Sequence, residues 1–459
     1  MPWAMIDAGR AFGHLLDSSR SEALAWATRR MVGVYNAVLA PLRLAAAAWA
    51  LRHARGPRAE EWRERMARRL PSVERPGGVW VHGASVGEVR IVTALARGLR
   101  KLRPDLPLVV SAVSPTGRAQ LPGAPDVDAA FFLPLDFSGM PTRVLRAVAP
   151  RVLTLVETEL WPNLLREADR LAVPVVLVNA RLSAAGMRWY RRLSGLYGPL
   201  LARVARVGAR SSADADRFRE LGVPSAAICV TGNVKYDLPL PGGDRARARR
   251  ELAIAGERPV LVAGSTRPGE ERILVESWRR LRADLPELLL VLAPRHPERF
   301  DEVERLLAGA GLRLARWSRP ATVDEPPAEA LLVDELGVLG RAYLAADVAF
   351  VGGTLVPVGG HNVLEPAAAG VPVLFGPYTS NVDDAAAELL AERGAERVTN
   401  AEELASAVAA LVRNPERAGA MGDAARHVVE ANRGALDRTI EIVLAAREAG
   451  LGRTPQGLL

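Results

Sequence analysis

One carboxylate in the sequence, Glu88, stands where it could take part in catalysis. It ends the motif HGASVGE, which follows the apolar run Val79–His82. A carboxylate in the first turn of a helix, at the carboxyl end of a strand, could accept a proton from an attacking hydroxyl group. Ser85 and Glu88 also have the spacing of a capping box, which would only stabilise the helix start. Both interpretations stay open. Ser85 and Gly87 are candidates for substrate contact, and the spacing is not the GxGxxG of a dinucleotide site.

A second acidic junction follows the apolar run Val152–Val156, in the motif ETELWPN. Glu157 and Glu159 flank Thr158 there. Thr158 could cap the next helix, and Glu159 could interact favourably with the helix dipole. Two carboxylates at the end of a strand could equally belong to a site, and the residues alone do not decide between these interpretations.

Lysine is rare enough in this chain to be informative. Of the 60 basic residues only Lys101 and Lys235 are lysines. Lys101 lies in an arginine-rich, solvated stretch, whereas Lys235 follows an apolar run in the motif TGNVKYD. A compact ammonium group fits a crowded site where negative charge develops. The alternative is that Lys235 is a lysine retained by chance.

Three loops in the second half of the chain could bind an anion. Small residues with free amides suit a phosphate, and an arginine can hold a phosphate or a base edge. A glycine-rich loop that enters a helix exposes backbone N–H groups, and a carboxylate in its first turn, Glu365, could accept ribose hydroxyls. Ordinary strand-to-helix turns need the same small residues and remain the alternative. The candidates are Gly264, Ser265 and Thr266; Arg295; and a glycine-rich loop made of Gly352, Gly353 and Thr354 with Gly359, Gly360, His361, Asn362, Val363, Leu364 and Glu365.

The sequence lacks the usual signatures of several other kinds of site. It has no HExxH motif, no paired His/Asp metal spacing and no GxSxG nucleophile elbow. Its single cysteine, Cys229, excludes CxxC sites and internal disulfides, and it lies in an apolar run typical of a buried thiol.

The elements that position these residues alternate between short apolar runs and amphipathic stretches. Such alternation predicts parallel sheets covered on both faces, so we expect two doubly wound α/β domains in tandem. The predicted strands are 79–82, 108–112, 130–133, 152–156, 175–178, 204–209 and 228–231, then 260–263, 288–292, 312–315, 330–333, 348–351 and 373–375. The predicted segments are a lead-in and membrane-associated helix (1–52), a first domain (53–237), a second domain (238–425) and a C-terminal helix packing back toward the first domain (426–459).

The segment Met31–Leu51 is apolar except for Arg43, and arginines flank it on both sides. Twenty-one helical residues would be long enough to cross a bilayer, but Pro41 and Arg43 in the middle argue against a clean crossing. The segment is therefore an anchor that spans the bilayer, a helix lying in its interface, or a buried core helix; we favour membrane attachment. The net charge is +8, and residues 1–75 hold 13 arginines against seven Asp and Glu. This clustering favours an anionic membrane surface over nucleic acid, with the body on the cytoplasmic side.

Taken in order, the motifs resemble those of one family. HGASVGE, ETELWPN, NARLS (Asn179–Ser183), TGNVKYD, GST, PRHPERF and GGHNVLEP are similar to the motifs of the Kdo transferases of lipopolysaccharide assembly. Those enzymes move 3-deoxy-D-manno-octulosonic acid (Kdo) from CMP-Kdo onto a lipid A precursor. The resemblance implies a GT-B fold, with two Rossmann-like domains and a cleft between them. It also implies no cofactor or metal, and a location at the bacterial inner membrane.

The resemblance also implies roles for individual residues. Glu88 matches the family's catalytic base, and Glu157 and Lys235 match residues that stabilise the transition state. Val338 stands where the family often has an acidic residue, so a contact there must come from the backbone. The implied contacts to CMP are Pro294 and Arg295; Leu336, Gly337 and Val338; and Asn362, Val363, Leu364 and Glu365.

We expect an inverting displacement in which Glu88 deprotonates a glucosamine hydroxyl and CMP leaves. Two alternatives remain. One is a UDP-sugar glycosyltransferase or epimerase of the same fold, and the other is a non-catalytic binder of nucleotides or nucleic acid.

Overall fold

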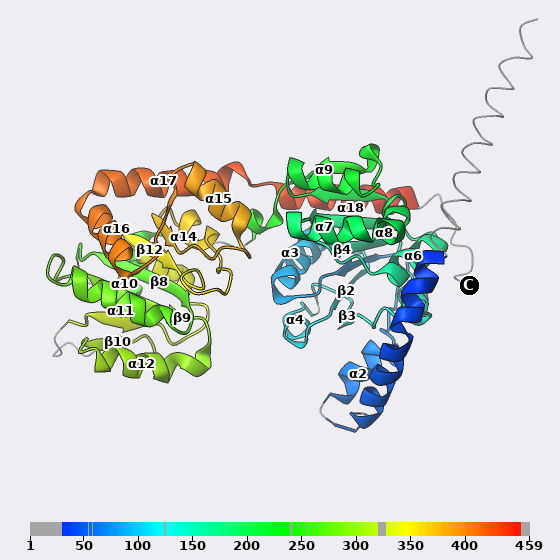
Figure 1. The fold of residues 1–459 in the computed structure, drawn as a ribbon, viewed down its shortest axis with the longest axis horizontal. Coiled ribbons are helices and arrows are strands. Elements are labelled where there is room, and N and C mark those ends of the chain that lie inside the picture. The colour runs from blue at the N-terminus through cyan, green and yellow to red at the C-terminus, as the bar shows by residue number, and fades with distance from the viewer. Residues whose placement is uncertain are drawn as a thin grey trace, which may run out of the picture. The chain divides into compact units, whose positions relative to one another are not determined.

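The computed structural model describes residues 30–450, apart from residues 54, 57, 124, 239, 240, 255 and 320–326. The chain divides into two compact units, which Figure 1 shows as separate α/β bodies. The first unit comprises Met1–Leu238 and Gly434–Leu459, and the second comprises Pro239–Arg433. Of the predicted lead-in, residues 1–29 lie outside the described residues.

The first unit is built on a parallel sheet of seven strands in the order β3-β2-β1-β4-β5-β6-β7. Its inner strands are rich in valine and leucine and buried along their whole length, as expected for a parallel sheet covered on both faces. The strands are β1 (Val79–His82), β2 (Leu108–Ala112), β3 (Ala129–Phe132), β4 (Val152–Val156), β5 (Val175–Ala180), β6 (Arg206–Ala209) and β7 (Ile228–Val230).

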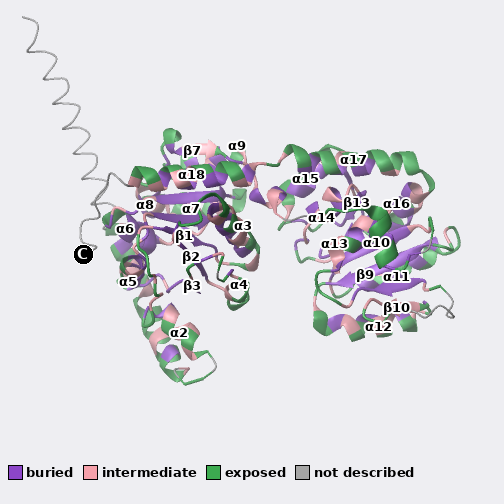
Figure 2. Ribbon diagram, turned by 180° about the vertical axis from the view of Figure 1, so that it is seen from behind, coloured by how far each residue is buried: buried purple, intermediate pink, exposed green. Residues whose placement is uncertain are grey.

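Helices cover both faces of this sheet, and Figure 2 shows the buried strands between them. One core cluster joins the sheet to α3 and α18, and another joins it to α5, α6 and α8. The helices of the first unit are α2 (Ala59–Arg65), α3 (Val86–Leu102), α4 (Pro115–Ala119), α5 (Met140–Val148), α6 (Pro162–Arg170), α7 (Ala184–Arg192), α8 (Ser194–Leu201), α9 (Ser212–Glu220) and α18 (Ala435–Ala449), with 3₁₀ turns η1 (Ser225–Ala227) and η2 (Val234–Asp237).

The second unit repeats this architecture with strand order β10-β11-β9-β8-β12-β13-β14, again all parallel. Its strands are β8 (Val260–Thr266), β9 (Leu289–Pro294), β10 (Leu314–Arg316), β11 (Ala330–Leu332), β12 (Val348–Val351), β13 (Val373–Phe375) and β14 (Ala395–Arg397). Its helices are α10 (Arg245–Glu251), α11 (Glu270–Leu281), η3 (Pro297–Arg299), α12 (Phe300–Gly309), α13 (Leu339–Ala345), α14 (Leu364–Ala368), α15 (Asp383–Ala391), α16 (Ala401–Arg413) and α17 (Pro415–Ala431).

The structure corrects one predicted boundary. A break after residue 425 would cut α17, which runs to Ala431 and packs in the second unit. The chain returns to the first unit at Gly434, whose φ of 86° gives the backbone the left-handed turn that ends one helix and starts the next. The sequence pattern is helical on both sides of this turn, so periodicity alone did not reveal the crossing.

Helix α18 packs against α3 and supports the segment that carries Lys235. Ile440 lies so close to Gly98 of α3 that a Cβ there would meet its Cδ1 at 2.4 Å. At the start of α18, the amides of Gly434 and Leu436 donate hydrogen bonds to Asp237, at 2.8 and 2.7 Å. Because Asp237 ends η2, the C-terminal helix helps to fix η2 against the sheet.

Candidate functional site

Glu88 lies at the start of α3, directly after the turn that follows β1. Ser85 is extended and caps the helix, with its Oγ accepting the amide of Glu88 at 3.4 Å. In return, Glu88 accepts hydrogen bonds from the Ser85 hydroxyl at 2.8 Å and from the amide of Ala84 at 2.7 Å. The capping interpretation is therefore correct for the geometry, and the carboxylate is half-buried rather than enclosed.

The surroundings of Glu88 raise its pKa to about 7. Burial is the largest cause, followed by repulsion from Glu159, while the Ala84 and Ser85 hydrogen bonds work in the opposite direction; Glu157 adds a smaller repulsion. A plain capping carboxylate would be stabilised as an anion and would have a low pKa. The raised pKa means that Glu88 can take up and release a proton near neutral pH.

Glu157 and Lys235 are brought together, as two residues of one site would be. Lys235 Nζ lies 3.1 Å from Glu157 Oε1. Glu157 has a φ of 58°, a left-handed conformation that costs a non-glycine residue about 1–2 kcal/mol. Such strain directly after a buried strand is more common at functional sites than elsewhere.

A buried asparagine on β5 holds the segment of Lys235 in place. Asn179 is fully buried, also has a positive φ (49°), and its Oδ1 accepts the amide of Val234 at 2.9 Å. The motif NARLS marked this residue, but its connection to Val234, far along the sequence, is visible only in the structure.

Glu159 also belongs to this neighbourhood. Its Oε2 accepts the indole N–H of Trp161 at 2.8 Å and lies 3.7 Å from Nε2 of His82. His82 is fully buried, and its Nδ1 lies 2.9 Å from the Ser111 hydroxyl. The first unit therefore gathers Glu88, Glu157 and Glu159 near one another, with one lysine, at the carboxyl ends of β1 and β4.

In the second unit, Gly264 and Thr266 of the GST motif are buried and support the fold, whereas Ser265 is partly accessible. A Cβ on Gly264 would meet the buried Tyr343 hydroxyl at 2.1 Å, so close packing requires glycine there. Thr266 is fully buried and its hydroxyl donates to Glu271 at 2.9 Å. Ser265 is half-buried, with a φ of 57° at a bulge between β8 and β9. Of the three, Ser265 is placed to meet a ligand.

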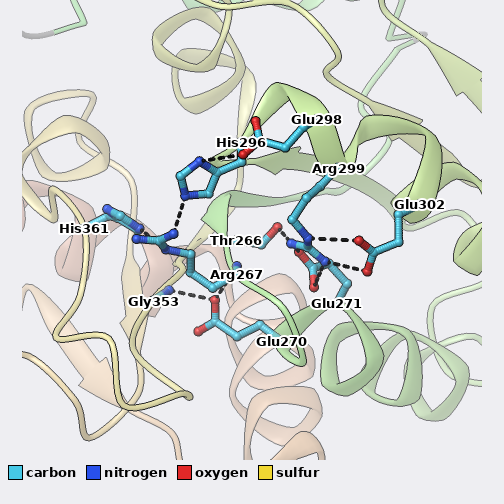
Figure 3. A network of polar contacts seen from close by, with 10 residues as sticks. All are labelled: Thr266, Arg267, Glu270, Glu271, His296, Glu298, Arg299, Glu302, Gly353 and His361. Atoms are coloured by element: carbon cyan, nitrogen blue, oxygen red, sulfur yellow. Dashed lines mark hydrogen bonds and ion pairs between the residues drawn. The ribbon is translucent and has the colours of Figure 1, made fainter. Parts of the chain in front are cut away.

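Arg267, which is not among the predicted site residues, lies at the centre of a cationic cluster (Figure 3). Its Nε donates to Nε2 of His361 at 3.2 Å, and its Nη1 contacts Nε2 of His296. Burial lowers the pKa of His361 to about 4, and Arg267, Arg295 and His296 lower it further in that order. His361 is therefore neutral at pH 7, and its Nε2 accepts a hydrogen bond from the guanidinium of Arg267, which carries the charge. Arg295 is exposed beside this cluster.

The structure corrects the expectation that the glycine-rich loop exposes its amides. The carboxylate of Glu270, itself fully buried, accepts the amides of Gly353, Thr354 and Leu355 at 2.7 to 3.0 Å. The amide of Gly360 donates to the carbonyl of Gly353 at 2.7 Å, and that of His361 to the carbonyl of Gly352 at 3.2 Å. An internal carboxylate thus occupies the anion-binding turn, and α14 behind it has only five residues. The cationic side chains are the better anion ligands here.

The remaining predicted residues lie on two loops of the second unit. Leu336 and Gly337 are exposed after β11, whereas the Val338 side chain is buried, so only its backbone could touch a ligand. Asn362 donates to Glu365 at 3.1 Å and accepts the amide of Leu364 at 3.2 Å. Asn362 and Glu365 are half-buried, while Pro294, Val363 and Leu364 are buried.

A buried ion-pair network anchors the loop that carries His296. Arg299 donates to both oxygens of Glu271, at 2.6 and 3.2 Å, and also pairs with Glu302 (Figure 3). This network fixes η3 against α11, so we assign it a structural role. Among the described residues, no group of three or more His, Cys, Asp and Glu side chains is arranged to hold a metal ion.

The chain is similar to one protein family and to individual members of it. A family model described as 3-deoxy-D-manno-octulosonic-acid transferase (kdotransferase) matches residues 60–238. A 3-deoxy-D-manno-octulosonic acid transferase of Haemophilus influenzae is 35% identical over 391 residues, which cover 83% of this chain and 91% of the relative. The enzyme of the same name from Bordetella pertussis is 39% identical over 374 residues, covering 79% and 86%.

Solved structures share the two-domain fold. A UDP-GlcNAc 2-epimerase from Neisseria meningitidis, bound to UDP-GlcNAc, matches with a TM-score of 0.56 and 14% identity over 80% of this chain and its whole length. A glycosyltransferase from Rickettsia africae matches with a TM-score of 0.54 and 13% identity over 83% of this chain and its whole length. At such low identity the likeness concerns the fold alone, and it is that of GT-B glycosyltransferases.

Proposed function

Because the chain belongs to the 3-deoxy-D-manno-octulosonic acid transferase family, the glycosyltransferases that use CMP-Kdo in lipopolysaccharide synthesis, we propose that it transfers Kdo to a lipid A precursor of the lipid IVA type, with inversion at the anomeric carbon. The observation that carries this mechanism is the pKa of about 7 at Glu88, in a half-buried carboxylate beside Glu159. A base must be ionised at working pH and still bind a proton well, and a pKa near 7 meets both needs.

In the proposed step, a hydroxyl group of the acceptor glucosamine attacks the anomeric carbon of Kdo. Glu88 takes the hydroxyl proton, the new carbon–oxygen bond forms, and the bond from the anomeric carbon to the phosphate oxygen breaks. CMP leaves with the electron pair of that bond. The ammonium of Lys235, oriented by Glu157 at 3.1 Å, is the group of the first unit that offsets developing negative charge.

The donor is proposed to bind to the second unit. CMP-Kdo carries two anionic groups, a phosphodiester and the carboxylate of the sugar acid. Arg267 and Arg295 supply two guanidinium groups for them, since a guanidinium matches the geometry of both anions. Ser265 is available as a hydroxyl ligand, and Asn362 and Glu365 are available for the ribose hydroxyls.

The surroundings proposed for the reaction are the bacterial inner membrane, with the catalytic body on its cytoplasmic face. The acceptor is a lipid, so the enzyme must work at a membrane surface, and the arginine-rich residues 30–75 favour anionic headgroups. No cofactor, metal or nucleic acid is part of the proposal.

The test is a donor panel read by mass spectrometry. The lipid A precursor is incubated with the protein and CMP-Kdo, or with UDP-hexoses, in the presence of EDTA. We expect the precursor to gain the mass of one or more Kdo residues with CMP-Kdo only. Transfer from a UDP-hexose, or epimerisation of a UDP-hexose, would contradict the proposal, and loss of transfer in EDTA would contradict its metal-free part.

A further inference from the structure

The helix Arg30–Arg52 is long and apolar enough to cross a bilayer by length and composition, with a mean hydropathy of 1.4. It is nonetheless bound to the folded body along one face. Val32 and Ala50, near its two ends, are buried in the core cluster of the first unit, and Tyr35, Leu39, Ala46 and Ala47 pack against that cluster. These positions repeat every three or four residues, so they form one face of the helix.

Polar contacts hold the first half of this helix. The Tyr35 hydroxyl donates to Asp136 Oδ2 at 3.1 Å, and Asn36 and Asn163 exchange two side-chain hydrogen bonds, at 3.1 and 2.8 Å. Asp136 and Asn163 are buried, and Asp136 also accepts the amides of Asn163 and Leu164, both at 2.9 Å, at the start of α6. The first turns are therefore tied to the start of α6 in the first unit.

The second half of the helix lies along α2, which returns beside it after a short connection (Figures 1 and 2). Helix α2 has the sequence AEEWRER and is tied to the sheet, because Glu64 accepts the amide of Phe132 at 2.7 Å. The carbonyl of Arg65 accepts the amide of Leu135 at 2.9 Å. A charged helix with these connections cannot enter hydrocarbon together with its partner.

These attachments leave too little free helix for a crossing. Between Asn36 and Ala46 lie nine residues, about 14 Å of helix, whereas a bilayer core is about 30 Å thick. A spanning orientation would place either the Tyr35 and Asn36 contacts or the charged residues of α2 in the hydrocarbon, at a cost of several kcal/mol per unsatisfied group.

The opposite face of the helix is apolar and exposed. Its six large side chains are between 48% and 74% exposed, and they run the length of the helix for about 26 Å. We call them the apolar stripe: Val34, Val38, Leu42, Leu44, Trp49 and Leu51. Six such side chains, spread over the half of the helix that does not pack on the core, mark an interaction surface rather than an ordinary water-facing helix.

The arginines complement this stripe. Arg43, the charge that argued against a clean crossing, comes four residues after Leu39 and seven before Ala50, so it lies on the face that looks toward the body. Arg52 is exposed at the end of the helix, and Arg55 and Arg58 are exposed in the connection to α2. An exposed apolar face with an arginine at each end of the helix, Arg30 and Arg52, and a tryptophan within it is the pattern of a helix that lies in a membrane interface.

We propose that the helix Arg30–Arg52 lies in the plane of one leaflet of an anionic bilayer, with the apolar stripe in the lipid and the first unit resting on it, and does not cross the membrane. This deepens the proposed membrane location by deciding between the two kinds of attachment that the sequence left open. The occupant of the stripe is the lipid surface, because the flanking arginines match anionic headgroups; a second copy of the chain would bring the same arginines together.

Two single-cysteine variants test the orientation. Cys229 is the only cysteine, so Cys229→Ser gives a background without thiols, into which Arg30→Cys or Arg52→Cys is introduced. A membrane-impermeant maleimide is added to inverted inner-membrane vesicles or to spheroplasts. We expect both positions to react in inverted vesicles and neither in spheroplasts. Labelling of one end in spheroplasts and of the other in inverted vesicles would overturn the proposal.

A second experiment tests the stripe itself. The purified protein and the variant Val38→Gln/Leu42→Gln are sedimented with vesicles of phosphatidylglycerol and phosphatidylethanolamine, and with neutral phosphatidylcholine vesicles. We expect at least a tenfold weaker partition for the variant, and weaker binding of the natural chain to neutral vesicles. Val230→Gln, which changes an exposed apolar residue on β7, is the matched control and should bind normally.

The outcomes distinguish this inference from the proposed function. Transfer of Kdo to a detergent-dispersed acceptor should survive in the stripe variant, because the stripe is distant in sequence from every proposed catalytic residue. Unchanged vesicle binding by the variant, or a stripe that holds a dimer in detergent-free solution, would overturn the inference and leave the proposed reaction standing.

Discussion

At the scale of the residue, Glu88 combines two properties that usually oppose each other. Its carboxylate accepts hydrogen bonds from the Ala84 amide and the Ser85 hydroxyl at the start of α3, and these bonds favour the anion. Its pKa is nevertheless raised to about 7. Burial and the neighbouring Glu159 therefore outweigh the two hydrogen bonds. The result is a carboxylate fixed in direction by its cap and able to bind a proton at neutral pH.

The first prediction concerns this balance. The base proposed here, Glu88, could accept a proton only when ionised, so kcat/KM should fall as the pH drops through about 7. Glu159→Gln removes the negative charge but keeps an acceptor for the Trp161 indole N–H. It should move the acidic limb of the profile to lower pH by roughly half a unit to one unit. A pH–rate profile of both proteins measures the shift.

The control is Asp216→Asn, which removes an exposed ion pair on α9. This change should leave the acidic limb of the pH–rate profile at the same pH. An unmoved limb in Glu159→Gln, or a limb that persists in Glu88→Gln, would show that another group sets the pH dependence.

The second prediction concerns Arg267. Two nitrogens of its planar guanidinium contact His361 and His296 at the same time. A lysine has only one nitrogen at its end and cannot make both contacts with this geometry. We expect Arg267→Lys to raise the KM for CMP-Kdo by about tenfold or more, with a smaller change in kcat. Calorimetry of CMP binding and initial rates give the two quantities.

Arg272→Lys, at an exposed position on the neighbouring helix α11, is the matched control and should behave as the natural enzyme. A normal KM in Arg267→Lys would remove this residue from the donor site.

The sequence identified some of these residues and could not identify others. Lys235 stood out because lysine is rare here, and Glu88 because its motif ends a strand. Arg267 gave no such signal, since it is one of 58 arginines. Its two histidine partners lie 29 and 94 residues away, so only the fold brings them together. The sequence also did not reveal that Glu270 binds the amides of Gly353 and Thr354, because these residues are more than 80 positions away from it.

At the scale of the element, the positions of the proposed groups depend on strand ends held in unusual conformations. Glu157, Asn179 and Ser265 all have positive φ at the carboxyl end of a buried strand. Other non-glycine residues with positive φ, such as Ala149 and Ala172, lie at or just after helix ends, where this conformation is ordinary. The strain is thus found next to the proposed chemistry.

The third prediction follows from Asn179, a positioning residue that fixes η2 by binding the amide of Val234. Asn179→Ala should lower kcat, because Lys235 loses its fixed place, and should lower stability by about 1–3 kcal/mol, because a buried amide loses its acceptor. Asn179→Asp keeps the acceptor oxygen and should restore part of kcat. Rates and thermal unfolding of both variants separate the two effects.

If Asn179→Ala and Asn179→Asp lose stability equally while kcat stays unchanged in both, the residue is structural only. If kcat falls without rescue by Asn179→Asp, the oxygen that accepts Val234 is not what positions Lys235.

Most strands could be predicted because a strand buried on both faces is a short, continuous apolar run. Every strand predicted from the sequence is present, with small differences at its ends. The strand β14 (Ala395–Arg397) was missed, because three residues at the edge of a sheet, two of them charged, carry no apolar pattern. The C-terminal boundary was misplaced because α17 and α18 are separated by only three residues.

At the scale of the whole molecule, the chain has one unit with carboxylates and a lysine and a second unit with arginines and histidines. The first set suits proton transfer, and the second suits a ligand with two negative charges. This division agrees with a reaction in which a neutral hydroxyl group attacks an anionic, activated sugar. It also explains why no single motif indicated the function, whereas their ordered set did.

The most direct test of the central claim is the single-turnover rate of Glu88→Gln beside its affinity for CMP-Kdo. Glutamine keeps the size of the side chain and an acceptor for the Ala84 amide, but it cannot take a proton. We predict that transfer to the lipid A precursor falls by about 100-fold or more, while the dissociation constant for CMP-Kdo stays within about twofold of that of the natural enzyme. A variant that transfers Kdo at the natural rate would show that Glu88 is only a helix cap.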